Sequence, residues 1–225
     1  MSLRPLLAAG LGLAALLLQP LARADDAPVN CPLDVSAAAV LPGVPLAHLA
    51  GGRLLVGSAA NSFAPWSDLR YRSVLAQQFA MLVPENEMKW KFIHPQQDRY
   101  DFRYADCLVH FAQQHGMKVM GGPLVWHFQQ SPWLDTLDLD HDGYVALLRD
   151  HIRSVIGHFR ERFPGVVTQW EVVNEPISNE TCAKTLKCGL RSYFWSRKLG
   201  AEYINLAFKF AREADPQAQL LLNET

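Results

Sequence analysis

Short apolar segments with the composition of buried strands alternate with longer amphipathic segments from about residue 53 onward. Strands are expected over residues 53–60, 79–85, 118–126, 166–174 and 217–223. Helices are expected over residues 67–78, 104–115, 143–163 and 194–214. Strands that alternate with helices predict a parallel sheet covered by helices, which places the chain in the α/β class.

Polar residues follow four of the predicted strands at their carboxyl ends. They are Glu85-Asn86, Trp126-His127, Asn174-Glu175 and Asn223-Glu224. A doubly wound nucleotide-binding fold usually has a glycine-rich phosphate loop after its first strand, and "GSAAN" at residues 57–61 lacks one. A site assembled from successive strand ends is typical of a (β/α)8 TIM barrel. We therefore predict the barrel.

The length of the chain limits how much of a barrel it can form. A complete barrel has eight β/α units in ~250 residues, whereas five strands are recognisable in this sequence. We expect an incomplete barrel, about the first five units, over residues 53–225, preceded by an N-terminal segment over residues 25–52. Its open sheet edges and exposed apolar faces would favour aggregation.

Residues 1–24 have the pattern of a secretory signal peptide. A short basic start is followed by an apolar run over residues 6–18 and by "LARA" at residues 21–24, an A-x-A cleavage pattern. An uncleaved anchor is the alternative, but spanning a bilayer takes about 20 apolar residues. We expect a secreted or periplasmic protein with no membrane attachment after cleavage.

Export would make the four cysteines candidates for disulfides. Cys182 and Cys188 bracket a short polar segment, and we expect them to pair. A zinc site is the alternative, but no second closely spaced Cys or His pair completes four ligands. Cys107 lies on the apolar face of a predicted helix, where the sequence leaves open both a buried free thiol and a bridge to Cys31.

The charge of the chain gives no reason to expect a polyanionic partner. Its 21 basic and 22 acidic residues give a formal net charge of −1. We therefore expect neither nucleic acid nor an anionic membrane surface as a partner. The oligomeric state is not indicated.

The stretch "PENEMKW" at residues 84–90 forms a polar cluster after the second predicted strand. The cluster comprises Glu85, Asn86, Glu87 and Lys89. A sugar site needs such donors and acceptors for hydroxyl groups beside an aromatic wall. A solvated loop with an asparagine helix cap is the alternative, although the flanking apolar residues favour partial burial.

The stretch "GGPLVWHFQQSPWL" at residues 121–134 ends the third predicted strand with Trp126 and His127 and adds Gln129 and Trp133. One tryptophan at a strand end more often belongs to the core, but two with a histidine and two glutamines favour a carbohydrate site. His127 has no histidine or carboxylate nearby at ligand spacing, so we predict no metal and no cofactor.

The stretch "WEVVNEP" at residues 170–176 carries two carboxylates on its predicted strand. Because strand side chains alternate between faces, Glu171 and Glu175 should share one face and Asn174 should lie on the other. Glu171 is in mid-strand, where a charge needs a paired neighbour. Glu175 is at the strand end, where a carboxyl shielded by aromatic rings can serve as a general acid. We predict Glu175 as catalytic and Glu171 as structural.

These motifs together resemble glycoside hydrolase family 10, whose members are mostly endo-1,4-β-xylanases. The order and spacing of "PENEMKW", "PQQDRYDF" (95–102), "LVWHFQ" followed by "PWL", and "WEVVNEP" match the family from about Leu54 to Thr225. The resemblance implies a retaining glycosidase that hydrolyses internal β-1,4-xylosidic bonds of xylan. It implies Glu175 as acid/base and Asn174 as the residue that holds the 2-hydroxyl of the sugar. It places Glu85, Asn86 and Lys89 on the glycone side, and Trp126, His127 and Gln129 beside the cleaved bond.

The resemblance places the nucleophilic carboxylate of a retaining enzyme at the end of a seventh strand. Five strands do not reach it, so we expect negligible xylan hydrolysis by the 225-residue chain and a further carboxylate in an extended reading frame. A non-catalytic sugar-binding remnant is therefore one alternative function.

Three single positions and one three-residue stretch depart from the family pattern. Gly122 replaces a histidine that contacts sugar in relatives, Glu171 replaces the commoner aspartate, Asp98 replaces glycine, and Asn223-Glu224-Thr225 stands for Asn-Asp-Tyr. The absent histidine motivates a second alternative, the same mechanism acting on another β-linked polysaccharide.

Overall fold

The computed structural model of the chain describes residues 31–178 and 189–224. The predicted signal peptide and the predicted Cys182–Cys188 pair lie outside the described residues. Within these residues, no helix is long and apolar enough to cross a membrane.

Five parallel strands form the main sheet, in the spatial order β1-β2-β3-β4-β7. They are β1 (Gly57–Ala60), β2 (Met81–Pro84), β3 (Lys118–Gly121), β4 (Val167–Asn174) and β7 (Gln219–Asn223). Each strand lies beside its predecessor, as in a barrel wall, and the order never reverses as it does in a doubly wound sheet. The predicted α/β class and the five predicted strands are confirmed.

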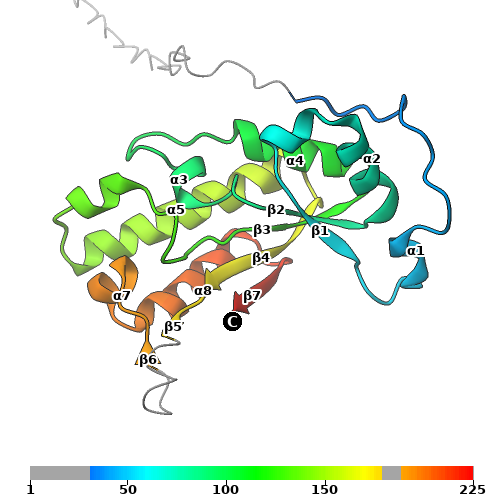
Figure 1. Ribbon diagram of the computed structural model, residues 1–225. Coiled ribbons are helices and arrows are strands. Elements are labelled where there is room, and N and C mark those ends of the chain that lie inside the picture. The colour runs from blue at the N-terminus through cyan, green and yellow to red at the C-terminus, as the bar shows by residue number, and fades with distance from the viewer. Residues whose placement is uncertain (1–30, 179–188, 225) are drawn as a thin grey trace, which may run out of the picture.

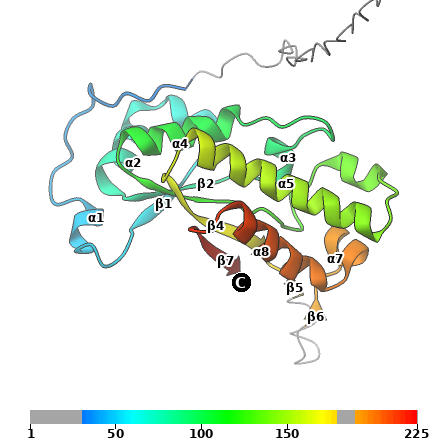
Figure 2. The same ribbon diagram turned by 180° about the vertical axis from the view of Figure 1, so that it is seen from behind.

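The long helices connect successive strands and lie together on one face of the sheet. They are α2 (Leu69–Gln78), α4 (Arg103–Gln114), α5 (His141–Arg162) and α8 (Glu202–Ala214). α4, α5 and α8 lie in front of the strands in Figure 2 and behind them in Figure 1. Two begin at aspartate caps, because Asp68 accepts a hydrogen bond from the Arg70 amide and Asp140 from the Gly143 amide.

Two predicted elements are interrupted by glycine. β3 ends at Gly121 rather than at Trp126, because Gly122 has φ 110° and Pro123 has no amide to donate to a neighbouring strand. The chain resumes pairing when Leu124 and Val125 donate to the carbonyls of β4. The predicted helix over residues 194–214 divides at Gly200, where φ is 60°, into α7 (Phe194–Leu199) and α8.

Six further elements are too short for a periodic pattern, and the sequence did not predict them. They are α1 (Leu46–Leu49), η2 (Ala64–Ser67), α3 (Trp90–Ile93), η3 (Pro132–Thr136), β5 (Ile177–Ser178) and β6 (Gly189–Leu190). β5 and β6 form an antiparallel pair directly after Glu175.

The core fills the space between the sheet and the helices. Phe111 of α4, Phe159 of α5 and Tyr203 of α8 are fully buried and belong to one apolar cluster with Trp170 of β4. A Cβ at Gly121 would lie 2.4 Å from the Trp170 ring. Glycine at this position therefore lets the indole pack directly against the backbone of β3.

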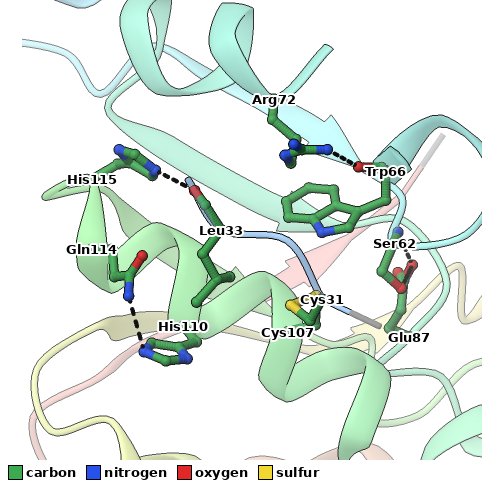
Figure 3. Close-up of a disulfide and its surroundings, with 10 residues drawn as sticks. All are labelled: Cys31, Leu33, Ser62, Trp66, Arg72, Glu87, Cys107, His110, Gln114 and His115. Carbon is green, nitrogen blue, oxygen red and sulfur yellow. Dashed lines mark hydrogen bonds between the residues drawn. A yellow bond between two sulfur atoms is a disulfide. The ribbon is translucent and has the colours of Figure 1, made fainter. Parts of the chain in front are cut away.

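A disulfide between Cys31 and Cys107 joins the N-terminal segment to α4 (Figure 3). The sequence left this bridge open beside a free thiol. A second contact follows along the segment, where the His115 ring donates to the Leu33 carbonyl at 3.1 Å. The N-terminal segment is thereby held against the outer, helical layer of the molecule.

Candidate active site

A polar cleft of about 220 Å³ lies at the carboxyl ends of the strands. Its polar lining consists of Glu85, Lys89, Trp126, Glu171, Asn174 and Asn223. These residues come from the ends of β2, β4 and β7 and from the turn after β3. The strand ends therefore converge on one site, as the sequence predicted.

Glu175 lies directly beyond β4 and at the edge of this cleft. Its carboxylate Oε2 accepts a hydrogen bond from Trp126 Nε1 at 3.2 Å, and its side chain is 20% exposed. Its backbone is left-handed, with φ 50°, an uncommon state for a residue other than glycine. The amide of Glu175 donates to the Asn223 carbonyl at 2.9 Å, which holds this conformation against the end of β7. A substrate oxygen can reach a carboxyl so placed.

His127 is the second side chain beside this carboxylate. Its Nε2 lies 3.8 Å from Glu175 Oε2, too far for a hydrogen bond. Burial lowers the pKa of His127, and the charge of Arg191 lowers it further, so the ring is neutral near neutral pH. Its buried Nδ1 has no hydrogen-bond partner within residues 31–178 and 189–224.

Asn86 links two other predicted sugar-binding residues, Lys89 and Gln129. Its Oδ1 accepts a hydrogen bond from Lys89 Nζ at 3.4 Å and another from Gln129 Nε2 at 3.3 Å. The ammonium of Lys89 also lies 4.8 Å from the centroid of the Trp126 ring. Burial lowers the pKa of Lys89, and the neighbouring carboxylates, including Glu85, act against this shift. These groups offer donors and acceptors beside an indole face.

Asn174 is buried at the end of β4 and its Oδ1 accepts a hydrogen bond from Asn223 Nδ2 at 2.9 Å. This contact fixes the orientation of the amide, because it identifies the oxygen and directs the Asn174 NH2 group elsewhere. Both asparagines line the cleft. Asn174 thus lines the cleft, and Glu175, the next residue, accepts a hydrogen bond from the lining residue Trp126.

The prediction that Glu171 and Asn174 lie on opposite faces of the strand is wrong. The pairing of β4 with β7 shifts register between Glu171 and Val173, so Val172 is an extra residue in β4. Such a bulge breaks the alternation of side chains. Glu171 and Asn174 both line the cleft. Burial raises the pKa of Glu171, and the charge of Lys89 opposes this shift.

Sequence reasoning missed Arg191, which fixes the backbone that carries Glu175. Its Nε donates to the Glu175 carbonyl at 3.2 Å, its amide to Pro176 at 2.7 Å and its terminal nitrogen to Ile177 at 2.9 Å. No motif surrounds Arg191, and only the pairing of β5 with β6 brings it back to this position.

The part of the chain that the structure describes contains no group of three or more His, Cys, Asp or Glu residues that could hold a metal ion. Beside Glu175, the cleft presents the carboxyls of Glu85 and Glu171, the Lys89 ammonium and neutral hydrogen-bonding groups.

A family model described as Glycosyl hydrolase family 10 matches residues 46–225. Endo-1,4-beta-xylanase B of Thermotoga neapolitana is 39% identical over 168 residues, with 74% of this chain and 45% of the relative covered. Beta-1,4-xylanase of Dictyoglomus thermophilum is 41% identical over 154 residues, with 68% and 41% covered.

Solved structures agree with these relatives. Xylanase 10B from Thermotoga petrophila in complex with xylobiose superposes with a TM-score of 0.72 at 36% identity, and 83% of this chain and 54% of that chain are covered. Native xylanase 10B from Thermotoga maritima superposes with a TM-score of 0.71 at 38% identity, and 80% and 53% are covered. The chain spans about half the length of the relatives it matches.

Proposed function

The chain belongs to glycosyl hydrolase family 10, and from this premise we propose that its cleft binds xylan and serves an endo-1,4-β-xylanase reaction. The observation that carries the proposal is the position of Glu175, whose carboxyl is held by the Trp126 indole at the edge of a polar cleft. The Thermotoga petrophila structure, which contains xylobiose, supports a xylo-oligosaccharide as the ligand.

Glu175 is the general acid and base of this reaction. It protonates the oxygen of the departing sugar and then, as a carboxylate, activates the water that completes hydrolysis with retention. The Trp126 N–H holds the carboxyl in place through both steps. Asn174, oriented by Asn223, offers its NH2 group to the 2-hydroxyl of the sugar. The family resemblance assigns the nucleophile to a seventh strand, and we propose none of the described carboxylates for that role.

Asn86 and Lys89 bind the sugars on the glycone side, and Gln129 contacts the sugar beside the cleaved bond. Lys89 has three N–H donors, one of which is bonded to Asn86 Oδ1, and the Gln129 amide donates to the same oxygen. Trp126 adds an apolar wall between these groups and Glu175. Such a combination recognises hydroxyl groups at one edge of a sugar and its carbon skeleton at the other.

Another β-linked polysaccharide is the second candidate substrate, and Gly122 is the observation that favours it. No side chain projects from this position, and a Cβ there would lie 2.4 Å from the Glu171 carbonyl oxygen. The Glu171 backbone occupies the space that a side chain would need, so the cleft lacks the side-chain contact that a histidine supplies at this point in the family. One constraint on the identity of the sugar is thereby removed.

Calorimetric titration of the chain with xylotetraose, cellotetraose and mannotetraose tests these substrates. We expect xylotetraose to bind most tightly. Preferential binding of cellotetraose or mannotetraose would move the assignment to the other glycan, and failure of all three to bind would contradict a glycan site.

The role of Glu175 is tested with an aryl xylobioside, which reveals slow hydrolysis by colour. Whatever hydrolysis the chain supports should fall by roughly 10²- to 10⁴-fold in Glu175→Gln. Binding of xylotetraose should persist in the variant, because the glycone-side residues are unchanged. Binding without hydrolysis is the result expected of the 225-residue chain itself, whereas measurable hydrolysis that is unchanged in Glu175→Gln would contradict the assigned role.

We further propose that residues 1–24 direct export and that the Cys31–Cys107 bridge forms in the oxidising environment outside the cytoplasm. N-terminal sequencing of secreted protein should begin at Asp25. Thiol alkylation should label Cys31 and Cys107 only after reduction. Labelling of either cysteine before reduction would contradict the bridge.

A further inference from the structure

We propose that Glu171 is a substrate-binding residue, whose carboxylate accepts a hydrogen bond from a hydroxyl group of the sugar held in the cleft beside Lys89. This inference rests on the proposed function and deepens it. It assigns to Glu171 a direct contact with the ligand in place of the structural role that its mid-strand position predicted.

The carboxyl of Glu171 is not used to hold the fold together. Its Oε1 is buried and has no hydrogen-bond partner in the part of the chain that the structure describes. Buried carboxylates with a structural role are normally satisfied by hydrogen bonds, so an unsatisfied one requires a reason. The side chain lines the cleft, and its last torsion is soft enough to turn either oxygen toward a ligand.

The backbone of Glu171, not its side chain, pairs β4 with the neighbouring segment. Its carbonyl accepts a hydrogen bond from the Leu124 amide at 2.9 Å, which joins β4 to the segment after β3. The side chain of Glu171 is therefore not needed for this pairing. Gly122, directly after β3, has no side chain that could cover the carboxyl of Glu171.

Lys89 supplies the complementary charge on the other wall of the cleft. Both residues line the cleft, and Lys89 acts on Glu171 through space, while its ammonium hydrogen bonds to Asn86 Oδ1 at 3.4 Å. A hydroxyl group is both donor and acceptor. One sugar hydroxyl can thus accept from Lys89 and donate to Glu171, so a ligand placed in this way gives each buried charge a hydrogen bond.

The test titrates xylotriose and its monodeoxy analogues into the chain and into Glu171→Gln and Glu171→Ala. Glu161→Ala is the matched control, because Glu161 is exposed near the end of α5 and away from the cleft. A hydrogen bond to a charged group predicts that Glu171→Ala binds xylotriose at least about tenfold more weakly. Glu171→Gln keeps the shape and an acceptor oxygen, so an intermediate loss is expected.

The monodeoxy analogues separate a contact from an indirect effect. For the wild-type chain, one analogue should lose affinity to the same extent as the alanine variant loses it for xylotriose. Glu171→Ala should then fail to discriminate against that analogue, because the two changes remove one interaction. Thermal unfolding of each variant shows whether the fold is retained.

Two results would overturn the inference. Unchanged affinity in Glu171→Gln and Glu171→Ala would show that the carboxyl makes no contact. An equal loss for xylotriose and every analogue would show that Glu171 acts only through the fold or through the charge of Glu175. Both results leave the proposed function standing, whereas a wild-type chain that binds no xylo-oligosaccharide overturns the two together.

Discussion

At the scale of single residues, Glu87 shows a carboxylate with a structural role. It is 1% exposed and lies beside Ser62 (Figure 3), whose amide and hydroxyl donate to it at 2.6 and 2.8 Å. It also accepts a hydrogen bond from the Asn86 amide at 2.9 Å. It therefore joins the loop after β1 to the loop that carries Asn86. Glu171, with its unsatisfied oxygen, is the opposite case.

We expect Glu87→Gln to lower the free energy of unfolding by about 2 kcal/mol, because a charged acceptor is lost and the new NH2 group faces donors. Urea denaturation measures the change, and Glu161→Gln on the surface of α5 is the control. A loss no larger than that of the control would show that the three hydrogen bonds contribute little.

The pH dependence of stability should come in part from two buried histidines. His94 Nδ1 lies 3.1 Å from His151 Nδ1, and His151 stacks on Trp90 with 3.5 Å between ring centroids. Burial lowers the pKa of His94 from 6.5 to about 4. Burial lowers the pKa of His151 well below 6.5, and His94 adds to this shift.

The sign of the effect follows from where each state binds protons. Above pH 6.5 both histidines are neutral in the folded and unfolded chains, and their contribution is constant. Between pH 6.5 and about 4, the histidines become protonated in the unfolded chain and stay neutral in the folded chain. Stability should therefore fall by about 1.4 kcal/mol per pH unit for each histidine as the pH decreases.

Urea denaturation from pH 7 to about 4 measures this slope. His151→Phe, which keeps a ring against Trp90, should make the slope shallower. His48→Gln, at an exposed position in α1, should leave it unchanged. An equal slope in His151→Phe and the wild-type chain would contradict the assignment.

At the scale of elements, the sequence predicted the type and order of the strands and long helices but not their irregularities. Hydrophobic periodicity indicates which residues of a segment face the core, and it was sufficient to predict the type and position of β4 and α5. The bulge in β4 arises from its pairing with β7, which a local pattern does not contain. The sequence therefore predicted that Glu175 follows the strand end, as observed. It predicted the wrong orientation of Glu171 relative to Asn174, because the bulge lies between them.

The contact between β3 and β4 can be tested at Gly121. A Cβ there would lie 2.4 Å from the Trp170 ring, which is 1% exposed. Gly121→Ala must displace the indole or the strand, and we expect a loss of about 1–3 kcal/mol in the free energy of unfolding. Because Trp170 belongs to β4, the strand that ends at Asn174, weaker binding of xylo-oligosaccharides should accompany the loss.

Gly157 provides a matched control for this substitution. It lies inside α5, and a Cβ at this position has no other atom within 4 Å. Gly157→Ala should stabilise the chain by about 0.5–1 kcal/mol, because alanine loses less conformational freedom in a helix. If the two substitutions change stability in the same direction, the close approach at Gly121 does not carry the expected cost.

At the scale of the whole molecule, the five parallel strands and the helices that connect them belong to the (β/α)8 barrel of the family. The barrel places every strand end on one face, which explains how motifs far apart in sequence supply a single cleft. The motifs identified the polar residues of this cleft, because their chemistry is visible in the sequence. Arg191 belongs to no motif, and only the folded chain shows its contacts and that of the Asn223 carbonyl with the backbone of Glu175.

The same sheet has two edges in the described residues, β1 and β7. An edge strand offers unpaired amide and carbonyl groups to another chain. Leu222 is 48% exposed on β7, which adds an apolar contact to this edge. We therefore expect a polypeptide of these 225 residues to associate as its concentration rises, and light scattering after size exclusion measures the mass.

A charge on the edge strand should oppose this association. Leu222→Lys should shift the population toward monomer, because pairing would bring the added charge against another chain. Leu49→Lys in α1 changes a residue that is 68% exposed but lies outside the sheet, so it should have a smaller effect. An equal shift in both variants would assign the association to general surface hydrophobicity, and a wild-type chain that stays monomeric at every concentration would show that both edges are protected.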